Sequence, residues 1–268
     1  MSRLDGAAVL LTGGSRGLGP VIAEALARRG AKVALAARSA EGLRQVATRL
    51  AERGIGVEVL PADLREQAER EALVAAVRER LGRIDVLVNN AGLETEGAFT
   101  GLPWPALREN VEVNLVAPMA LAYLVLPEMV RRGAGHVVNV ASIAAKSGAP
   151  YAAAYSGTKA GLAEWTRALR LELAGTGVRF STIFPGYVTE AGMFAKFGVR
   201  APWTVGSCTP DDVAAAVVRA IERNRVEAIV NSRPVRYSFV LGELLPAAGD
   251  WLMRAGGVVA FQRRKVGL

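Results

Sequence analysis

Cysteine and histidine are almost absent from this chain of 268 residues, which holds one of each, Cys208 and His136. A single cysteine excludes an internal disulfide framework and is typical of proteins from a reducing compartment. One cysteine and one histidine are also too few for a zinc or iron–sulfur centre, so we expect no metal site. The chemistry must therefore depend on other side chains.

Lysine and long hydrophobic runs are scarce as well. Five of the 33 basic residues are lysines, the formal net charge is +8, and the segment 219–268 alone carries nine basic and four acidic residues. The basic residues are mostly isolated and do not alternate with aromatic ones, so we expect no nucleic-acid partner. No run approaches the roughly 18 apolar residues of a membrane helix, and the N-terminal apolar run is too short for a signal peptide. We therefore expect a cytoplasmic protein.

Apolar runs alternate with stretches of helical character along the chain, and the runs lack the in–out pattern of a half-exposed sheet. Such runs are typical of parallel strands that are covered on both faces. The expected strands are 7–11, 32–37, 56–60, 84–88, 136–141, 178–184 and 227–231. The expected helices are 17–29, 40–53, 66–81, about 105–130, 151–174 and 211–223. This order predicts one α/β domain over 1–268, a doubly wound parallel sheet of about seven strands (a Rossmann fold) with helices on both faces.

Two segments depart from the alternation. Residues 186–209 hold glycines, aromatics and a proline without a clean period, which indicates a substrate lid. Residues 232–268 form an unusually apolar C-terminal extension with a net positive charge. One interpretation of the extension is a weak contact with an anionic membrane surface. The other is that its side chains cover a subunit interface or one side of the pocket, the candidates being Phe239, Leu241, Leu245, Trp251 and Phe261.

A glycine-rich loop, TGGSRGLG (12–19), follows the first expected strand and leads into a helix. Such a loop lets backbone N–H groups approach a pyrophosphate, which the N-terminus of the helix also favours. Alone the motif is weak, because glycine turns also have purely structural uses. Its position after the first strand favours a nucleotide cofactor, with candidate contacts at Gly13, Ser15, Arg16, Gly17, Leu18 and Gly19.

The end of the second expected strand indicates which nucleotide is bound. An NAD site normally offers an acidic residue there for the ribose 2′-hydroxyl, but this chain has Ala37 followed by Arg38. Arg38 and Arg16 could together flank a 2′-phosphate, although both could also be ordinary surface arginines. The sequence therefore favours NADP(H) over NAD(H).

The stretch YSGTK places Tyr155 and Lys159 four residues apart, on one face of an expected helix. A surface pair on an amphipathic helix would look the same. The alternative is a phenol whose pKa is lowered by the neighbouring ammonium, which would make it an acid–base catalyst. The small residues around the pair would leave room for a cofactor and a substrate.

Six motifs in one order resemble the short-chain dehydrogenase/reductase family in its compact single-domain branch, over about residues 5–231. They are TGGSRGLG, NNAG (89–92), Asn114 in VEVNLVAP, Ser142 in NVASIAA, YSGTK and FPG (184–186). The resemblance implies that Tyr155 is the general acid–base and that Lys159 lowers its pKa and binds the nicotinamide ribose. It also implies that Ser142 binds the substrate oxygen. Asn114 would interrupt its helix and hold a water for proton relay.

The same resemblance implies further cofactor contacts, at Asp63, Leu64, Asn89, Ala91, Gly92, Pro185, Gly186 and Val188. Asp63 could equally be a helix cap. After FPG the family usually has Val-x-Thr, whereas this chain reads Tyr187-Val188-Thr189-Glu190, so Val188 carries over and the threonine stands one place early.

Together these features predict an oxidoreductase that transfers a hydride between NADPH and a carbonyl or alcohol substrate, in a homodimer or homotetramer. Alternatives are a non-catalytic NADP(H)-binding sensor and a lipid-surface protein. A fairly bulky, apolar substrate is indicated by the candidate pocket residues Tyr151, Tyr187, Met193, Phe194, Phe197 and Trp203. The same side chains could equally pack between the lid and the core.

Overall fold

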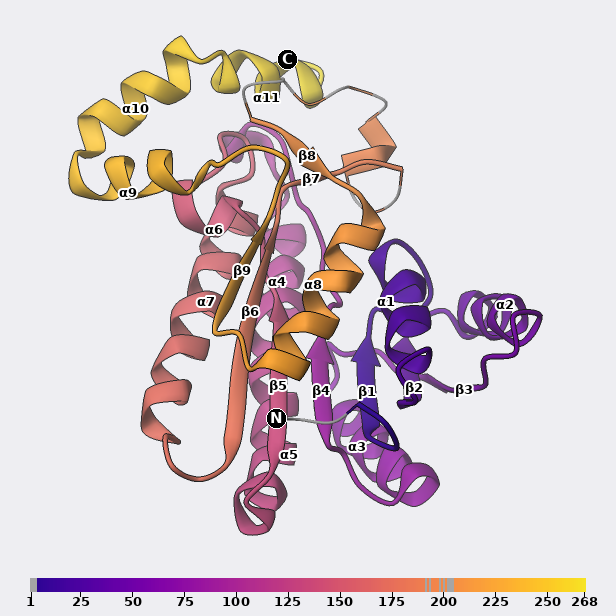
Figure 1. Cartoon of the computed structure of the whole chain (residues 1–268). Coiled ribbons are helices and arrows are strands. Elements are labelled where there is room, and N and C mark those ends of the chain that lie inside the picture. The colour runs from indigo at the N-terminus through magenta and orange to yellow at the C-terminus, as the bar shows by residue number, and fades with distance from the viewer. Residues whose placement is uncertain (1–3, 191, 193, 198, 200, 202–204) are drawn as a thin grey trace.

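The computed structural model describes residues 4–190, 192, 194–197, 199, 201 and 205–268. Its centre is a seven-stranded sheet in the order β3-β2-β1-β4-β5-β6-β9, in which every neighbouring pair is parallel (Figure 1). The strands are β1 (Ala8–Thr12), β2 (Lys32–Ala37), β3 (Val57–Pro61), β4 (Val86–Asn89), β5 (Gly135–Val140), β6 (Val178–Pro185) and β9 (Glu227–Val230). The predicted fold class is confirmed, and each expected strand lies within two residues of its observed bounds.

Helices cover both faces of this sheet. The first layer contains α1 (Leu18–Ala27), α2 (Ala40–Ala51) and α8 (Pro210–Arg223), whose apolar residues share one core with β1 and β2. The second contains α3 (Gln67–Leu81), α5 (Ala117–Arg132) and α7 (Ala153–Glu172), which enclose a second core. Strands buried between two layers need apolar side chains in both directions, which explains why their sequences show no alternation.

A continuous helical stretch, Trp104–Arg132, is long and apolar enough to cross a membrane by length and composition alone. It reaches that length because α4 (Trp104–Val111), a π-helical turn η2 (Glu112–Val116) and α5 join without a break. No such span was expected from the apolar runs of the chain. Core helices pass the same test, and here Leu121 and Met129 are fully buried in the second core. We therefore treat the stretch as a packed helix of the domain.

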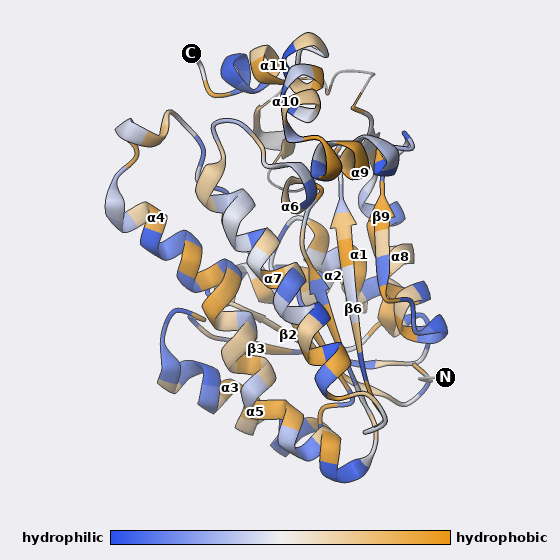
Figure 2. Cartoon of the chain, turned by 90° about the vertical axis from the view of Figure 1, so that its left-hand side faces the viewer, coloured by the Kyte–Doolittle hydropathy of each residue, from blue (hydrophilic) through white to orange (hydrophobic). Residues whose placement is uncertain are grey.

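Apart from α8 and β9, the described segments that follow β6 gather at the carboxyl end of the sheet. They include β7 (Tyr187–Val188), paired with β8 (Ser207–Cys208), and the short turn η3 (Phe194–Phe197). The C-terminal extension folds into α9 (Arg236–Leu244), α10 (Pro246–Ala255) and α11 (Val258–Lys265). Figures 1 and 2 show these three helices together beyond the strand ends, near α6 (Ala144–Ser147). A last short turn, η1 (Phe99–Gly101), precedes α4.

Candidate active site

A cavity of about 1180 Å³ opens at the carboxyl ends of the strands, where doubly wound sheets bind their ligands. It runs from the glycine-rich loop to the C-terminal helices, so it is large enough for a dinucleotide and a substrate together. The predicted site residues that line it are Gly13, Ser15, Arg16, Gly17, Leu18, Arg38, Asp63, Leu64, Ala91, Gly92, Ser142, Tyr155, Lys159, Pro185, Gly186 and Val188. Three further predicted residues, Gly19, Asn89 and Asn114, are buried behind this lining.

The glycine loop needs glycine for two separate reasons. Gly13 has a φ of +70°, which L-residues rarely adopt, and a Cβ there would lie 2.9 Å from the Cα of Ala91. Gly19 has an ordinary φ, but a Cβ there would lie 2.1 Å from the carbonyl oxygen of Gly13. Gly19 therefore acts on the cofactor site indirectly, by letting the first turn of α1 close against the loop.

Two residues that tie the loop to the end of β4 were missed by sequence reasoning. The Thr12 hydroxyl accepts hydrogen bonds from the backbone N–H groups of Asn90 and Ala91, at 3.0 and 3.1 Å. The Asn90 amide donates to the carbonyl of Thr12 at 3.0 Å, and Asn90 lines the cavity. Asn89 instead donates to the buried amide oxygen of Asn139 on β5 at 2.8 Å. Of the adjacent asparagines in NNAG, the second faces the cavity and the first joins two strands.

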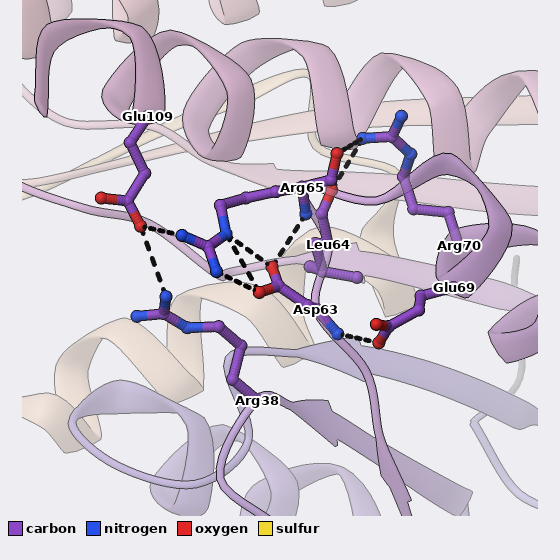
Figure 3. Close-up of polar contacts among 7 residues, drawn as sticks. All are labelled: Arg38, Asp63, Leu64, Arg65, Glu69, Arg70 and Glu109. Carbon is purple, nitrogen blue, oxygen red and sulfur yellow. Dashed lines mark hydrogen bonds and ion pairs between the residues drawn. The ribbon is translucent and has the colours of Figure 1, made fainter. Parts of the chain in front are cut away.

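The predicted 2′-phosphate region contains a four-residue ionic network (Figure 3). Arg38 lies at the end of β2 and donates to Glu109 of α4 at 3.3 Å, with half of its side chain exposed. Arg65, a residue that the sequence did not single out, donates to the same Glu109 oxygen at 3.0 Å and also pairs with Asp63. These contacts hold the pKa of Asp63 below its usual value, chiefly through its hydrogen bond with Arg65.

The alternative role of Asp63 as a helix cap is not what the structure shows. Its carboxylate accepts from the backbone N–H of Arg65 at 3.0 Å, whereas α3 begins later, after Glu66. The Asp63 carboxylate therefore closes a short turn beside Leu64, and both residues border the cavity.

Asn114 interrupts its helix, as expected, because it is the centre of the π-helical turn η2. Its side chain is fully buried and pairs with the backbone of Leu93 in both directions, at 2.7 Å to the N–H and 2.8 Å to the carbonyl. It also donates to Asn110 and Thr158, at 3.1 and 3.2 Å. A π-turn re-aims a side chain from the regular helical spacing. Here it fixes the loop after β4 against α7.

Tyr155 and Lys159 project from one side of α7, and both are buried, which excludes the alternative of a surface pair. The Lys159 ammonium donates to the carbonyl of Val140 at 2.9 Å and lies 5.8 Å from the centre of the Tyr155 ring. A Cβ on Gly92 would lie 3.5 Å from this ammonium, so glycine is what leaves the space beside it open.

The electrostatics of the pair differ from the sequence-based expectation. Burial lowers the pKa of Lys159 to about 8, and the negative charge of Glu94 opposes that change. The pKa of Tyr155 is raised, not lowered: burial is the main cause, Glu94 adds to it, and the hydrogen bond with Ser142 works in the other direction. The expected lowering by Lys159 is thus wrong for the protein without cofactor, because the low-dielectric site disfavours the charged form of both groups.

Ser142 follows β5 and lines the cavity. Its hydroxyl accepts the backbone N–H of Ala144 at 3.1 Å and bonds with Tyr155. The Ser142 hydroxyl therefore closes the turn after β5 and also bonds with the Tyr155 phenol.

The segment after β6 shows where Thr189 lies, the threonine that stands one place earlier than in the family pattern. Val188 and Gly186 line the cavity, but the Thr189 hydroxyl donates to the carbonyl of Cys208 at 3.3 Å and Thr189 does not line the cavity. Glu190 has a φ of +67° and is also outside the lining. Thr189 therefore joins β7 to β8.

On the side of the cavity where the substrate is expected, aromatic side chains form a cluster that includes a residue of α11. The Tyr187 ring lies 4.7 Å from that of Phe194 and 5.5 Å from that of Phe261, between ring centres. Tyr187 and Phe194 line the cavity, whereas Tyr151 and Phe197 do not. Met193 and Trp203 lie outside the described residues. The extension therefore covers one side of the pocket: Phe239 lines the cavity, and Phe261 packs behind the lining residue Tyr187. Leu241, Leu245 and Trp251 remain partly or largely exposed.

This arrangement fits a nicotinamide dinucleotide, because glycine positions with no room for a Cβ cradle one end of the cavity and an acid–base pair lies at the other. When bound, that cofactor supplies or accepts the hydride. The site thus defines an NAD(P)-dependent oxidoreductase. Residues 7–199 match the sequence pattern described as short chain dehydrogenase. The chain belongs to the short-chain dehydrogenase/reductase family.

Several similar proteins span nearly the whole chain. The ketoacyl reductase HetN of Nostoc sp. (strain PCC 7120) is 42% identical over 270 residues, which cover 99% of this chain and 94% of that protein. A dehydrogenase/reductase SDR family protein 7-like of Anopheles gambiae is 31% identical over 263 residues, covering 94% and 83%.

Two solved structures share the fold. A single-residue variant of the actinorhodin polyketide ketoreductase with NADPH superposes with a TM-score of 0.78 at 35% identity, covering 86% of this chain and 98% of that one. A metagenomic short-chain oxidoreductase in complex with NADP has a TM-score of 0.73 at 33% identity, covering 87% and 99%.

Proposed function

We propose that this protein is an NADPH-dependent reductase of ketoacyl compounds, in which a ketone on an apolar acyl chain is reduced to an alcohol. The observation that carries the proposal is that Ser142 and the buried residues Tyr155 and Lys159 line one cavity that begins at the glycine loop. Two similar proteins support the details, since one is named a ketoacyl reductase and another is a polyketide ketoreductase crystallised with NADPH.

The residues of the chain divide the work as follows. Ser142 donates a hydrogen bond to the ketone oxygen and so orients and polarises it. Tyr155 donates its phenolic proton to that oxygen as negative charge develops there. The ordinary pKa of a tyrosine is about 10, and that of Tyr155 is raised further, so the phenol holds the proton that the reduction needs at neutral pH. Lys159 binds the ribose hydroxyls and stabilises the phenolate that remains.

The lining of the cavity beyond the catalytic set supports an apolar substrate. Side chains from β7, η3 and the C-terminal helices face this part of the cavity, among them Tyr187, Phe194, Phe239, Leu252, Met253 and Val258. Burying one methylene of an acyl chain against such residues contributes about 0.8 kcal/mol. We therefore expect KM to fall as the acyl chain lengthens.

The preference for NADPH is part of the proposal and is supported by Arg38, Arg65 and Arg16 near the predicted 2′-phosphate. The test is NADPH oxidation with ketoacyl thioesters of increasing chain length, using Tyr155→Phe as the blank. Turnover that Tyr155→Phe abolishes without loss of NADPH binding supports the proposal. NADPH binding without turnover of any ketone would favour the alternative of a cofactor sensor.

We also propose that the protein forms homodimers or homotetramers in the cytoplasm. The single cysteine supports this location, and exposed Tyr123 on α5 and Leu171 on α7 support assembly through these helices. Light scattering after size-exclusion chromatography tests the assembly. Weak membrane-surface contact is supported by apolar residues of the extension that are exposed, namely Tyr237, Leu244, Leu245 and Trp251. Pelleting with anionic vesicles tests this contact.

A further inference from the structure

The last helix of the chain places a lysine inside the cavity. The side chain of Lys265, at the end of α11, is only 1% exposed. Its ammonium lies 3.3 Å from a carboxylate oxygen of Glu94 and 2.5 Å from one of Glu96. All three residues line the cavity, and the two glutamates belong to the segment after β4. Because α11 lies beyond the residues 7–199 that match the family, the family match assigns no role to Lys265.

Burying three ionisable groups is unfavourable unless their charges balance. The pKa of Glu96 is raised to about 8, first by burial and then by its hydrogen bond with Glu94, while Lys265 opposes the change. Glu96 is therefore mostly protonated at neutral pH, and Lys265 matches the negative charge that remains in the cluster. Removing the ammonium would leave this cluster with one uncompensated negative charge.

That charge acts directly on the catalytic pair. Glu94 adds to the rise that burial causes in the pKa of Tyr155. It also opposes the lowering of the Lys159 pKa by burial. Burial raises the pKa of Tyr187 of β7, and the charges of Glu96 and Glu94 raise it further. The other side of the ammonium is aromatic, since it lies 4.5 Å from the ring centre of Phe197 and 5.6 Å from that of Phe194. Lys265 is thus the cation that packs between the glutamates and the aromatic wall.

We propose that Lys265 is a positioning residue of the active site, which docks α11 onto Glu94 and Glu96 and offsets their negative charge beside Tyr155. The inference rests on the proposed function, which assigns proton transfer to Tyr155. In this arrangement the C-terminal extension sets the ionisation of the catalytic phenol as well as covering the pocket.

The test compares Lys265→Met with Arg264→Met, a matched control that removes the same charge from an exposed position on the same helix. The readout is the pH profile of NADP⁺-dependent oxidation of the product alcohol, whose acidic limb reports ionisation of Tyr155. Lys265→Met is expected to move that limb upward by about one pH unit. Glu94→Gln is expected to move it downward, Lys265→Arg to restore most of the wild-type position, and Arg264→Met to leave it unchanged.

Opposite shifts cannot come from a general loosening of the pocket, so they distinguish charge from structure. If Lys265→Met does not fold, the direction of the Glu94→Gln shift still decides. The inference would be overturned if the acidic limb had the same position in Lys265→Met and Arg264→Met. It would also be overturned if Glu94→Gln moved that limb to higher pH. If no alcohol or ketone is turned over, the proposed function fails. The inference is then decided by the ultraviolet phenolate titration of Tyr155 with NADP⁺ bound, whose positive charge lowers the pKa of the phenol. The titration is taken as the difference from Tyr155→Phe, and an unchanged midpoint in Lys265→Met refutes the inference.

Discussion

Replacing Arg38 with aspartate should reverse the preference between NADPH and NADH. Arg38 shares Glu109 with Arg65 at the edge of the cavity, and we expect it to exchange that partner for the 2′-phosphate. A charge-assisted hydrogen bond contributes about 1.5–3 kcal/mol, and the lower end applies because the side chain is half exposed. Its loss corresponds to a roughly tenfold weaker affinity.

The aspartate adds a repulsion that the loss of arginine alone does not. A carboxylate beside the phosphate costs about a further 1 kcal/mol at an exposed site, so NADPH affinity should fall by roughly 50- to 100-fold. NADH has no phosphate at this position, and the new carboxylate can accept a hydrogen bond from its 2′-hydroxyl. Its affinity should therefore stay unchanged or improve.

Fluorescence titration of each nucleotide measures both affinities, and Arg38→Leu separates the lost attraction from the added repulsion. Arg44→Asp is the matched control, because Arg44 is an exposed arginine of α2 outside the cavity. Equal losses for NADPH and NADH would refute the reasoning, since they would mean that the substitution distorts the glycine loop. An NADPH affinity that Arg38→Asp and Arg44→Asp reduce equally would mean that only long-range charge is involved.

Three further predictions concern the buried polar groups and the loop. Lys159→Met should abolish activity but stabilise the cofactor-free protein by about 2 kcal/mol at pH 7, after allowing for the lost bond to Val140. Because the folded-state pKa of about 8 lies below the unfolded value of 10.5, this gain should shrink between pH 8 and 10.5, as thermal melts would show. His136 has its pKa lowered to about 3 by burial, so its contribution to stability should fall by about 2 kcal/mol from pH 7 to 5, and urea unfolding of His136→Gln should show a flatter pH dependence. Gly19→Ala should weaken both nucleotides at least roughly tenfold in fluorescence titrations, because its Cβ would displace the carbonyl of Gly13; equal binding by wild type and variant would contradict the close packing.

The fold was predictable because its signals are local and repeated. Each expected strand is an apolar run, and each expected helix has its own periodicity. The expected ends of these elements therefore lie within about two residues of the observed ends. The position of Tyr155 and Lys159 in one cavity was predictable for a related reason, since the two residues lie one helical turn apart. The choice between Asn89 and Asn90 was not, because a one-residue difference at the end of a strand decides which side chain faces the cavity.

Contacts between distant charges leave no signal in a sequence. Lys265 lies 171 positions from Glu94, and Arg65 lies 44 positions from Glu109. In a chain with 33 basic residues, no local pattern distinguishes these two from solvated ones. The expectation about the pKa of Tyr155 failed for the same reason. The shift of this pKa depends first on burial and then on the charge of Glu94, and neither can be inferred from the spacing of two residues on a helix.

The buried polar groups of the site are arranged so that the cofactor can complete their hydrogen bonds. An ammonium has three donors, and among the described residues Lys159 makes one hydrogen bond, to Val140. Asn114, by contrast, is satisfied by Leu93, Asn110 and Thr158, so it holds the neighbouring loop whether or not a ligand is present. Ribose hydroxyls placed beside Lys159 would replace some of the solvation that burial removes and would raise its pKa from about 8. Cofactor binding should therefore take up a proton in weakly alkaline solution, which a pH-stat or calorimetric titration at pH 8 to 9 would measure.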